Sequence, residues 1–333
     1  MKKVIAITIF LLISSNLKAE DANVAQGAAS YLDLGVGAKA AAMGNAYVSI
    51  ADDPTAVYWN AACLPYLKSH QVALMSSISN IGRKFNYVGY VFGLENQFSL
   101  FNRKKGIGIG WINYGVDDIQ GRDTYGNCTK KFSDSENTFI ISYGQEFVEN
   151  YCVGLGLKYL THELTDYGSA RGVGLDFGAL CNYSDFVFGM NLQNIMRKYE
   201  WEVNDPVLEH KFKYKEDILF NAKLGVSRIF LDDMLLLSFD IDKTDKQKIR
   251  LHFGGDYEII ENFHVRIGYD ELKITAGFGW IKYIFNSKIL NLDYGFVFER
   301  FGFDIVHRFS LGMKFGRQGP KKKKIYFLRG LIK

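Results

Sequence analysis

Proline, cysteine and long apolar runs are all scarce in this sequence. Only 4 of the 333 residues are proline and 4 are cysteine. No segment after residue 19 has the ~20 consecutive apolar residues that a membrane-spanning helix needs. The 6 histidines and 4 cysteines show no metal-ligand spacing. The sequence therefore predicts neither a helical membrane protein nor a metalloprotein, and it indicates no cofactor.

A basic face is also missing from the body of the chain. The formal charge is +4, but 10 of the 40 lysines and arginines lie in residues 1–19 and 316–333. Residues 20–315 contain the remaining 30 lysines and arginines and all 36 acidic residues, so this part of the chain is mildly acidic. A nucleic-acid-binding domain needs a clustered basic surface. We therefore expect no nucleic-acid partner.

The first nineteen residues, MKKVIAITIFLLISSNLKA, have the order of a secretory signal. Two lysines precede an apolar run from Val4 to Ile13, and a small-residue cleavage pattern ends at Ala19. The apolar run is about half the length of a spanning helix, which argues against a membrane anchor. We predict a cleaved signal peptide over 1–19, and hence an exported protein that is either soluble or a β-barrel.

Alternation of side chains decides between these two classes. Aromatic residues make up 15% of the chain, and there are 33 glycines. In 151–159, YCVGLGLKY, apolar residues alternate with cysteine, glycine and lysine, and 249–257 and 263–270 behave in the same way. The polar face of a soluble sandwich rarely collects glycine. The pattern predicts a transmembrane antiparallel β-barrel, apolar toward lipid and polar toward its lumen.

Fourteen segments carry this pattern or a close variant of it. They are 71–79, 84–94, 106–116, 136–147, 151–162, 170–182, 185–195, 216–229, 234–242, 248–259, 263–270, 272–285, 288–299 and 304–315. The even-numbered links are mostly short, apart from 95–105, and the longest links, 117–135 and 196–215, are odd-numbered. Short periplasmic turns and long outer loops produce this parity. The predicted organisation is a barrel over 70–315 and a basic tail over 316–333.

Residues 20–69 differ from the rest. The stretch GNAYVSIADDPTAVYWNAACL (44–64) has a helix start, with Asp52 or Asp53 as N-cap and Pro54 at the first helical position. GAKAAAMGNAYV, just before it, is a second short helical piece. We expect this region to fold into the barrel as a small plug. A periplasmic cap outside the barrel is the alternative.

The residues predicted to face the lumen carry both signs of charge. They are Lys158, Asp176, Lys223, Asp240, Asp242, Arg250, His252, Asp256, His264, Arg266, Asp270, Asp293, Glu299 and Arg308. The simplest interpretation is a rigid interior of ion pairs, so an apolar binding surface must come from the plug or the outer loops. Tyr199 and Trp201 in the link 196–215 could form a ligand-capture site; packing of loop or membrane-interface aromatics is the alternative.

The plug region also resembles a known family. The residues that carry the resemblance are Gly37, Ala38, Met43, Gly44, Ala51, Asp52, Asp53, Trp59, Asn60, Ala62 and Leu64, with Tyr58 completing the plug motif. They resemble the N-terminal signature of FadL-type outer-membrane proteins, most closely the PorV/PorQ-like branch. The sequence departs from that signature at Ala61, where proline is expected, and at Cys63, where glycine is expected.

The resemblance implies a monomeric barrel with an N-terminal hatch in the outer membrane of a diderm bacterium. Passive uptake of hydrophobic molecules such as long-chain fatty acids is the implied function. A PorV-like adaptor of a secretion system, or a structural or adhesive protein, is the alternative. The expected partners are outer-membrane lipid, hydrophobic small molecules and the barrel assembly machinery, which reads a closing aromatic such as Phe315.

Enzymatic motifs are weak. Residues 35–40, GVGAKA, fit a loose G-x-G-x-x-A pattern, but no strand precedes them and no βαβ unit surrounds them. We therefore expect no enzyme. The predicted register points Cys152 inward and Cys181 outward, so their Cβ atoms lie on opposite faces of the sheet and cannot come within the ~4 Å that a disulfide needs. We therefore expect four free thiols.

Overall fold

The computed structural model describes residues 27–79, 82–93, 103–205, 210–245, 247–271, 273–284, 288–298 and 305–315. The expected signal peptide, the basic tail and Glu299 lie outside the described residues. The strands are β1 (His70–Ser79), β2 (Arg83–Phe92), β3 (Lys105–Arg122), β4 (Cys128–Val148), β5 (Tyr151–Leu164), β6 (Gly168–Tyr183), β7 (Phe186–Gln193), β8 (Arg197–Asp205), β9 (His210–Glu216), β10 (Asn221–Phe230), β11 (Leu235–Thr244), β12 (Ile249–Ile260), β13 (Phe263–Asp270), β14 (Lys273–Ile284), β15 (Lys288–Phe298) and β16 (Ile305–Phe315).

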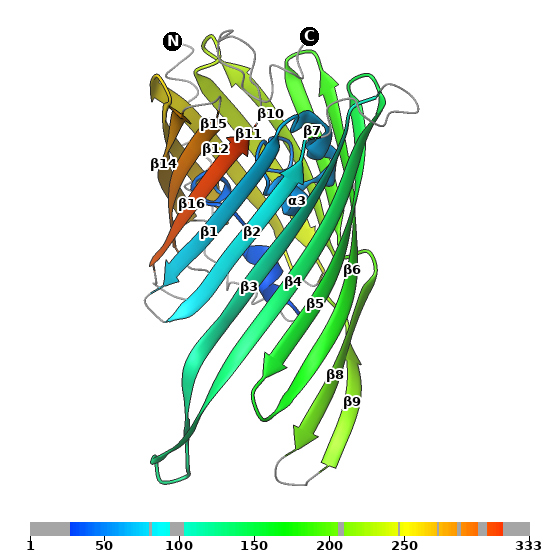
Figure 1. Ribbon diagram of the computed structural model, residues 1–333, viewed down its shortest axis with the longest axis vertical. Coiled ribbons are helices and arrows are strands. Elements are labelled where there is room, and N and C mark those ends of the chain that lie inside the picture. Colours follow the sequence, from blue (N-terminus) through cyan, green and yellow to red (C-terminus); the bar gives the residue numbers. More distant parts are fainter. Residues whose placement is uncertain are drawn as a thin grey trace.

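These strands close into one antiparallel ring of fourteen positions (Figure 1). β1 pairs with both β2 and β16, and the β5–β6 pairing completes the circle. β7 and β8 share one position, because both pair with β6, β7 along 177–183 and β8 along 168–174. β9 and β10 continue each other in the same way, pairing with β8 and β7. The predicted fold class and strand number are confirmed.

Two of the expected outer loops are wrong. The link 117–135 is mostly strand, since β3 runs to Arg122 and β4 starts at Cys128, and the link 196–215 contains β8 and β9. These segments continue the neighbouring strands into ladder pairings such as Tyr199 with Gly172. Figure 1 shows the hairpins β3–β4 and β8–β9 projecting beyond the rest of the barrel at its lower end. Extended pairing satisfies their backbone groups in water while both faces stay partly polar.

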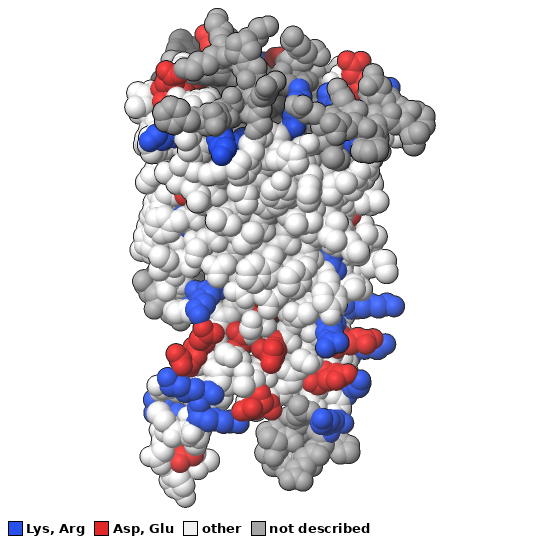
Figure 2. Space-filling view, in the orientation of Figure 1, with Lys and Arg blue, Asp and Glu red and all other residues white. Residues whose placement is uncertain are grey.

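The outward faces of the strands form an apolar belt. β5 shows the pattern most clearly, with Tyr151, Val153, Leu155, Leu157 and Tyr159 all exposed. In Figure 2 the middle of the visible face carries almost no charged side chain, and the charges gather toward the two ends. Such a belt is typical of a transmembrane barrel. Among the described helices, none has the length and apolar character to cross a membrane.

The N-terminal region forms a plug inside the ring. Its elements are η1 (Ser30–Leu34), α2 (Ala38–Ala42), α3 (Ala56–Trp59) and η2 (Ala61–Tyr66), and Figure 1 shows them within the barrel. Trp59, Tyr47 and Tyr58 are among the largest fully buried side chains. Helices this short are unstable alone, so the barrel wall must hold them. The inward plug is as predicted, and the external cap is excluded.

Glycines on the luminal face form the seat of the plug. A Cβ atom at Gly254 would lie 2.6 Å from the Met43 carbonyl oxygen, and one at Gly154 would lie 2.4 Å from the carbonyl carbon of Ala61. Both distances are too short for a side chain. The mixture of glycine and charge on the polar face therefore has a structural cause: glycine lets the backbone of the plug approach the wall.

Candidate functional site

Three residues of the plug motif brace the plug from within. Trp59 Nε1 donates to the Val36 carbonyl at 2.8 Å, and the Tyr58 hydroxyl donates to the Leu32 carbonyl. The Asn60 carboxamide donates to the Val48 carbonyl at 2.9 Å and accepts from the amide of Ala62 at 3.0 Å. These bonds cross-connect segments up to 26 residues apart, so the motif holds the plug in one shape.

The two adjacent aspartates have different roles. Asp52 binds Lys39 Nζ at 2.7 Å and accepts from the Tyr47 hydroxyl at 2.9 Å. Asp53 accepts from the Thr55 amide at 2.7 Å in the turn before α3. The helix begins at Ala56 with Thr55 as its N-cap, so the predicted N-cap at Asp52 or Asp53 and the predicted first helical position at Pro54 are wrong. Burial raises the pKa of both carboxyls. For Asp52 the charges of Lys39 and Lys314 and the hydrogen bonds from Lys39 and Tyr47 together outweigh burial, so its pKa is lowered. For Asp53 the charge of Asp52 raises the pKa further.

Gly44 is a plug residue that lies directly against the barrel wall. Its φ is +62°, and a Cβ atom there would lie 2.5 Å from the amide nitrogen of Tyr269. Its amide donates to Thr275 Oγ1 at 3.0 Å. Positive φ and the close approach both exclude larger residues. Gly44 therefore fixes the distance between plug and barrel.

Side chains of the wall complete the attachment. Asp240 Oδ2 accepts from the amides of Tyr47 and Val48, at 2.7 and 2.8 Å. Arg308 donates to the Gly35 carbonyl at 2.9 Å. These contacts come from β11 and β16, well separated around the ring, so the plug is held from several directions.

Charged residues fill the lumen around the plug, as predicted. Of the fourteen residues expected there, eleven are buried, Asp270 and Asp293 are partly buried, and Glu299 lies outside the described part. They form ion pairs such as Lys158–Asp176 at 2.8 Å, Arg266–Asp256 at 2.9 Å and Arg250–Asp242 at 2.5 Å. Paired charges of this kind stiffen the interior.

A small polar cavity lies beside the plug. Its volume is about 60 Å³, and its lining includes Asp33, Lys223, Arg250, Asp270 and Arg308. It has room for a few water molecules only. A hydrophobic solute therefore needs a movement of the plug or of the wall to pass this level.

Tyr199 and Trp201, the predicted capture residues, are on strand β8 rather than in a loop. Tyr199 is 1% exposed and belongs to the core, so it cannot serve as an open capture group. Trp201 stacks on Tyr214 of β9, with centroids 6.0 Å apart and planes 9° apart. Phe212 and Tyr214 are 46% and 43% exposed. The structure replaces the predicted loop site with a surface that we name the outer aromatic face: Trp201, Phe212 and Tyr214. The buried ring of Tyr199 packs behind it, against Trp201.

Sequence reasoning missed the β9 half of this face. The signal was present in residues 211–216, KFKYKE, where aromatic residues alternate with lysines. Three polar residues close to this face were also missed: Asp134, Glu136 and His162. Asp134 lies in an expected loop, and nothing in the sequence indicated that Glu136 and His162, at the ends of two expected strands, lie side by side. His162 Nε2 lies 2.6 Å from Asp134 Oδ1, and His162 Nδ1 lies 3.8 Å from Glu136 Oε2.

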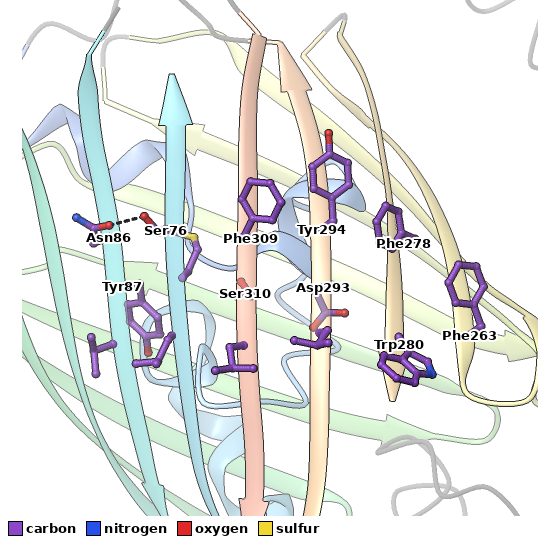
Figure 3. Close-up of a pocket in the computed structure, with 15 residues that line it drawn as sticks. Ser76, Asn86, Tyr87, Phe263, Phe278, Trp280, Asp293, Tyr294, Phe309 and Ser310 are labelled. Atoms are coloured by element: carbon purple, nitrogen blue, oxygen red, sulfur yellow. Dashed lines mark hydrogen bonds between the residues drawn. The ribbon is translucent and has the colours of Figure 1, made fainter. Parts of the chain in front are cut away.

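A second hollow, of about 890 Å³, lies on the outside of the barrel across β2, β1, β16, β15, β14 and β13 (Figure 3). Its lining is almost entirely apolar and includes Phe278, Trp280 and Phe309. Ser76 Oγ donates to Asn86 Oδ1 at 2.8 Å at one end. The exposed rings belong to the apolar belt, so the hollow opens toward lipid. Its floor includes the inward side chains Met75, Tyr87 and Ser310, and Ser310 Oγ accepts from the Ala38 amide of the plug at 2.9 Å.

No protein-family model and no curated protein matches the sequence. Solved structures do match. The toluene transporter TbuX of Ralstonia pickettii is 12% identical, covering 85% of this chain and 99% of its own, with a TM-score of 0.60. The toluene transporter TodX of P. putida matches at 12% identity, 85% and 99% coverage and a TM-score of 0.57.

A FadL homologue of Pseudomonas aeruginosa is also 12% identical, covering 84% of this chain and 98% of its own, with a TM-score of 0.54. At such low identity the likeness is one of fold. It extends over nearly the whole length of each of these proteins, and it agrees with the resemblance of the plug motif. The chain therefore has the fold of FadL-type outer-membrane proteins.

Proposed function

We propose that this protein is an outer-membrane barrel for the passive uptake of small hydrophobic compounds. The observation that carries the proposal is the outer aromatic face, which stands at the projecting end of a plugged barrel with a FadL-type fold. The apolar belt supports a membrane location. The names of two matched structures, both toluene transporters, point to the same class of solute.

The route begins at the outer aromatic face. The exposed rings of Phe212 and Tyr214 offer a water-facing apolar surface on which a hydrophobic solute loses contact with water. Beyond this face the plug blocks the lumen, because the cavity beside the plug has a volume of only about 60 Å³ and is too small for the solute. Release of contacts such as Asp240 with the amides of Tyr47 and Val48 would let the plug shift. Long-chain fatty acids are one class of solute that this route would take.

Uptake into lipid vesicles tests the proposal. Vesicles containing the purified protein should take up radiolabelled toluene and a radiolabelled fatty acid faster than empty vesicles. Trp201→Ala and Tyr214→Ala should slow uptake several-fold, since they remove the capture surface. Tyr125→Ala is the matched control, because Tyr125 is 89% exposed and is not part of the outer aromatic face. Equal rates of uptake in vesicles with and without the protein would contradict the proposal.

The tightly held plug favours a second candidate. A barrel whose lumen is filled and pinned from several strands is also suited to an adaptor, as in the PorV-like branch, that displays the projecting hairpins to a protein partner. Their outer faces carry exposed ion pairs, including Lys215–Glu200 at 2.9 Å. A pull-down with mass spectrometry distinguishes the two: an adaptor retains secreted protein, whereas an uptake protein retains small hydrophobic molecules. Among the described residues, every strand position of the ring is paired on both sides apart from the projecting hairpins, which supports a monomer.

A further inference from the structure

The outer aromatic face is part of a longer line of side chains across five strands. Glu136 pairs with His162, His162 with Ala170, Ala170 with Trp201, and Trp201 with Tyr214. Neighbouring strands lie about 4.8 Å apart, so this register places a carboxylate, an imidazole and two aromatic rings in one row. The His162 and Trp201 rings are 4.7 Å apart.

Acidic side chains surround the row. Asp134 and Glu136 both lie against His162, at 2.6 and 3.8 Å, and Glu216 accepts a hydrogen bond from Trp201 Nε1 at 3.2 Å. One imidazole faces three carboxyl groups. Burial raises the pKa of Glu136 to about 7, so Glu136 is partly neutral at neutral pH. The other two carboxylates still outnumber the imidazole, so the inner side of this wall keeps a net negative charge.

The lysines of the same hairpin do not neutralise it. Side chains alternate along a strand, so Lys213 and Lys215 point away from the side that carries Phe212, Tyr214 and Glu216. The Lys213 ammonium pairs with Glu202, and the Lys215 ammonium pairs with Glu200, both on the other side of the hairpin. The two sides of the hairpin therefore differ. The side turned away from the barrel axis is balanced in charge, whereas the side turned toward the axis is acidic and carries the outer aromatic face, so named because it lies at the outer end of the barrel.

Aromatic rings beside carboxylates attract organic cations. The negative face of an aromatic ring attracts an ammonium group, and a carboxylate adds direct charge attraction that an anionic ligand would meet as repulsion. We propose that the inner side of the β4–β5–β6–β8–β9 wall, at Tyr214, Trp201, Glu216 and Glu136, binds organic cations that carry an apolar group, namely amines or quaternary ammonium compounds. The proposed binding site names a class of solute for the proposed uptake. Its role in transport rests on the proposed function, but the binding itself is measured without transport.

A divalent metal is the competing occupant. Ligand atoms of Asp134, Glu136 and His162 all lie within 4.8 Å of one another. His162 already contacts one carboxylate through each ring nitrogen, and the rings of Trp201 and Tyr214 add nothing to a metal site. The combination of rings and carboxylates fits an organic cation better.

Three probes that share one ring and differ in charge test the inference. Calorimetric titration of the purified full chain with benzyltrimethylammonium, benzyl alcohol and benzoate should give the tightest binding for the cation. We expect at least about tenfold tighter binding than for benzoate, because attraction is replaced by repulsion. Zn²⁺ is titrated in parallel.

Matched variants locate the site. The titrations are made at pH 8, above the raised pKa of Glu136, which is about 7. Glu216→Gln and Glu136→Gln should each weaken cation binding about three- to tenfold and leave benzyl alcohol unchanged, since only the charge is removed. Glu202→Gln, on the opposite face of the same hairpin, should change neither. Circular dichroism and heat-modified migration on gels confirm that each variant is folded.

Equal affinity for the three probes, tighter binding of benzoate, or binding of Zn²⁺ without binding of the cation would each overturn the inference. An unchanged affinity in both the Glu216 and Glu136 variants would also overturn it. None of these results bears on vesicle uptake of neutral solutes, which is measured separately. Conversely, cation binding by a protein that transports nothing would sustain the inference and reject the proposed function.

Discussion

At the scale of single residues, the luminal face meets the plug in two ways. Glycines such as Gly254 and Gly154 admit the plug backbone to distances at which no Cβ atom fits. Charged residues such as Asp240 and Arg308 bind its amides and carbonyls. Close approach and hydrogen bonding therefore alternate around the plug, and the loss of either should be measurable.

Gly254→Ala should destabilise the protein, whereas its neighbour Gly255→Ala should not. The added Cβ at 254 would meet the Met43 carbonyl oxygen at 2.6 Å, but the Cβ at 255 points outward and meets nothing closer than a Leu237 methyl at 3.5 Å. We expect a cost of about 1–3 kcal/mol for the first and no loss for the second. Urea unfolding in lipid vesicles measures both. Equal unfolding midpoints for the two variants would show that the plug can shift to make room for the added methyl group.

The Lys39–Asp52 pair should make plug stability depend on pH. The folded protein lowers the pKa of Asp52, so its contribution is present above the ordinary aspartate value of about 3.9 and is lost as the pH falls through the lower folded value. The folded protein raises the pKa of Lys39, so the pair persists through neutral pH and is lost only in strong alkali.

Asp52→Asn should therefore cost about 3 kcal/mol at pH 7, and the difference from the natural protein should shrink below pH 4. Asp53→Asn is the control. Because its folded pKa is raised, the charged form of Asp53 is already disfavoured, and removal of that charge should cost less. Unfolding midpoints between pH 3 and pH 8 measure both, and a gap that stays constant over this range would contradict the assignment.

At the scale of elements, each strand separates lipid from lumen by alternation alone. β5 is the clearest case: Leu155 is 51% exposed to the outside, while Lys158 is buried inside in a pair with Asp176. Beyond the belt, the outward position Glu163 is exposed and polar. The strand therefore changes environment along its length as well as across its faces.

Leu155→Arg should cost about 2–4 kcal/mol, because it places a charge on the lipid face of the belt. Glu163→Arg, on the same face of the same strand but beyond the belt, should cost about 1 kcal/mol or less. Refolding into lipid vesicles, followed by urea titration, compares the two. Similar costs would mean that Leu155 does not face hydrocarbon.

At the scale of the whole molecule, the plug decides whether the barrel is open. Fourteen strand positions enclose the lumen. The plug and the ion pairs fill it and leave a cavity of only about 60 Å³ beside the plug. A filled barrel should conduct few ions across a planar bilayer. Removal of residues 27–66 should leave an open ring and raise its conductance many-fold.

The conductance experiment has a second variant in case the shortened chain does not fold. Asp240→Leu keeps the barrel whole but removes the acceptor for the amides of Tyr47 and Val48, and it should produce more frequent openings than Asp240→Asn, whose side-chain oxygen can still accept. A folded, plug-free barrel that stayed closed would show that something other than the plug seals the lumen.

The sequence by itself determined the barrel, its fourteen strand positions, the existence of a plug and the residues that line the lumen. Those features depend on local order, since a period of two assigns each side chain to a face without reference to other strands. The contact of Asp53 with Thr55 and the helical turn at 56–59 are likewise local.

Only the tertiary structure decided which residues meet. Glu136, His162, Trp201 and Tyr214 lie up to 78 residues apart and form one row solely through the register of four strand pairings. The extension of β3, β4, β8 and β9 beyond the belt, and the approach of Gly254 to Met43, depend in the same way on long-range pairing. Register and depth are properties of the closed ring, because each strand takes its position from its neighbours.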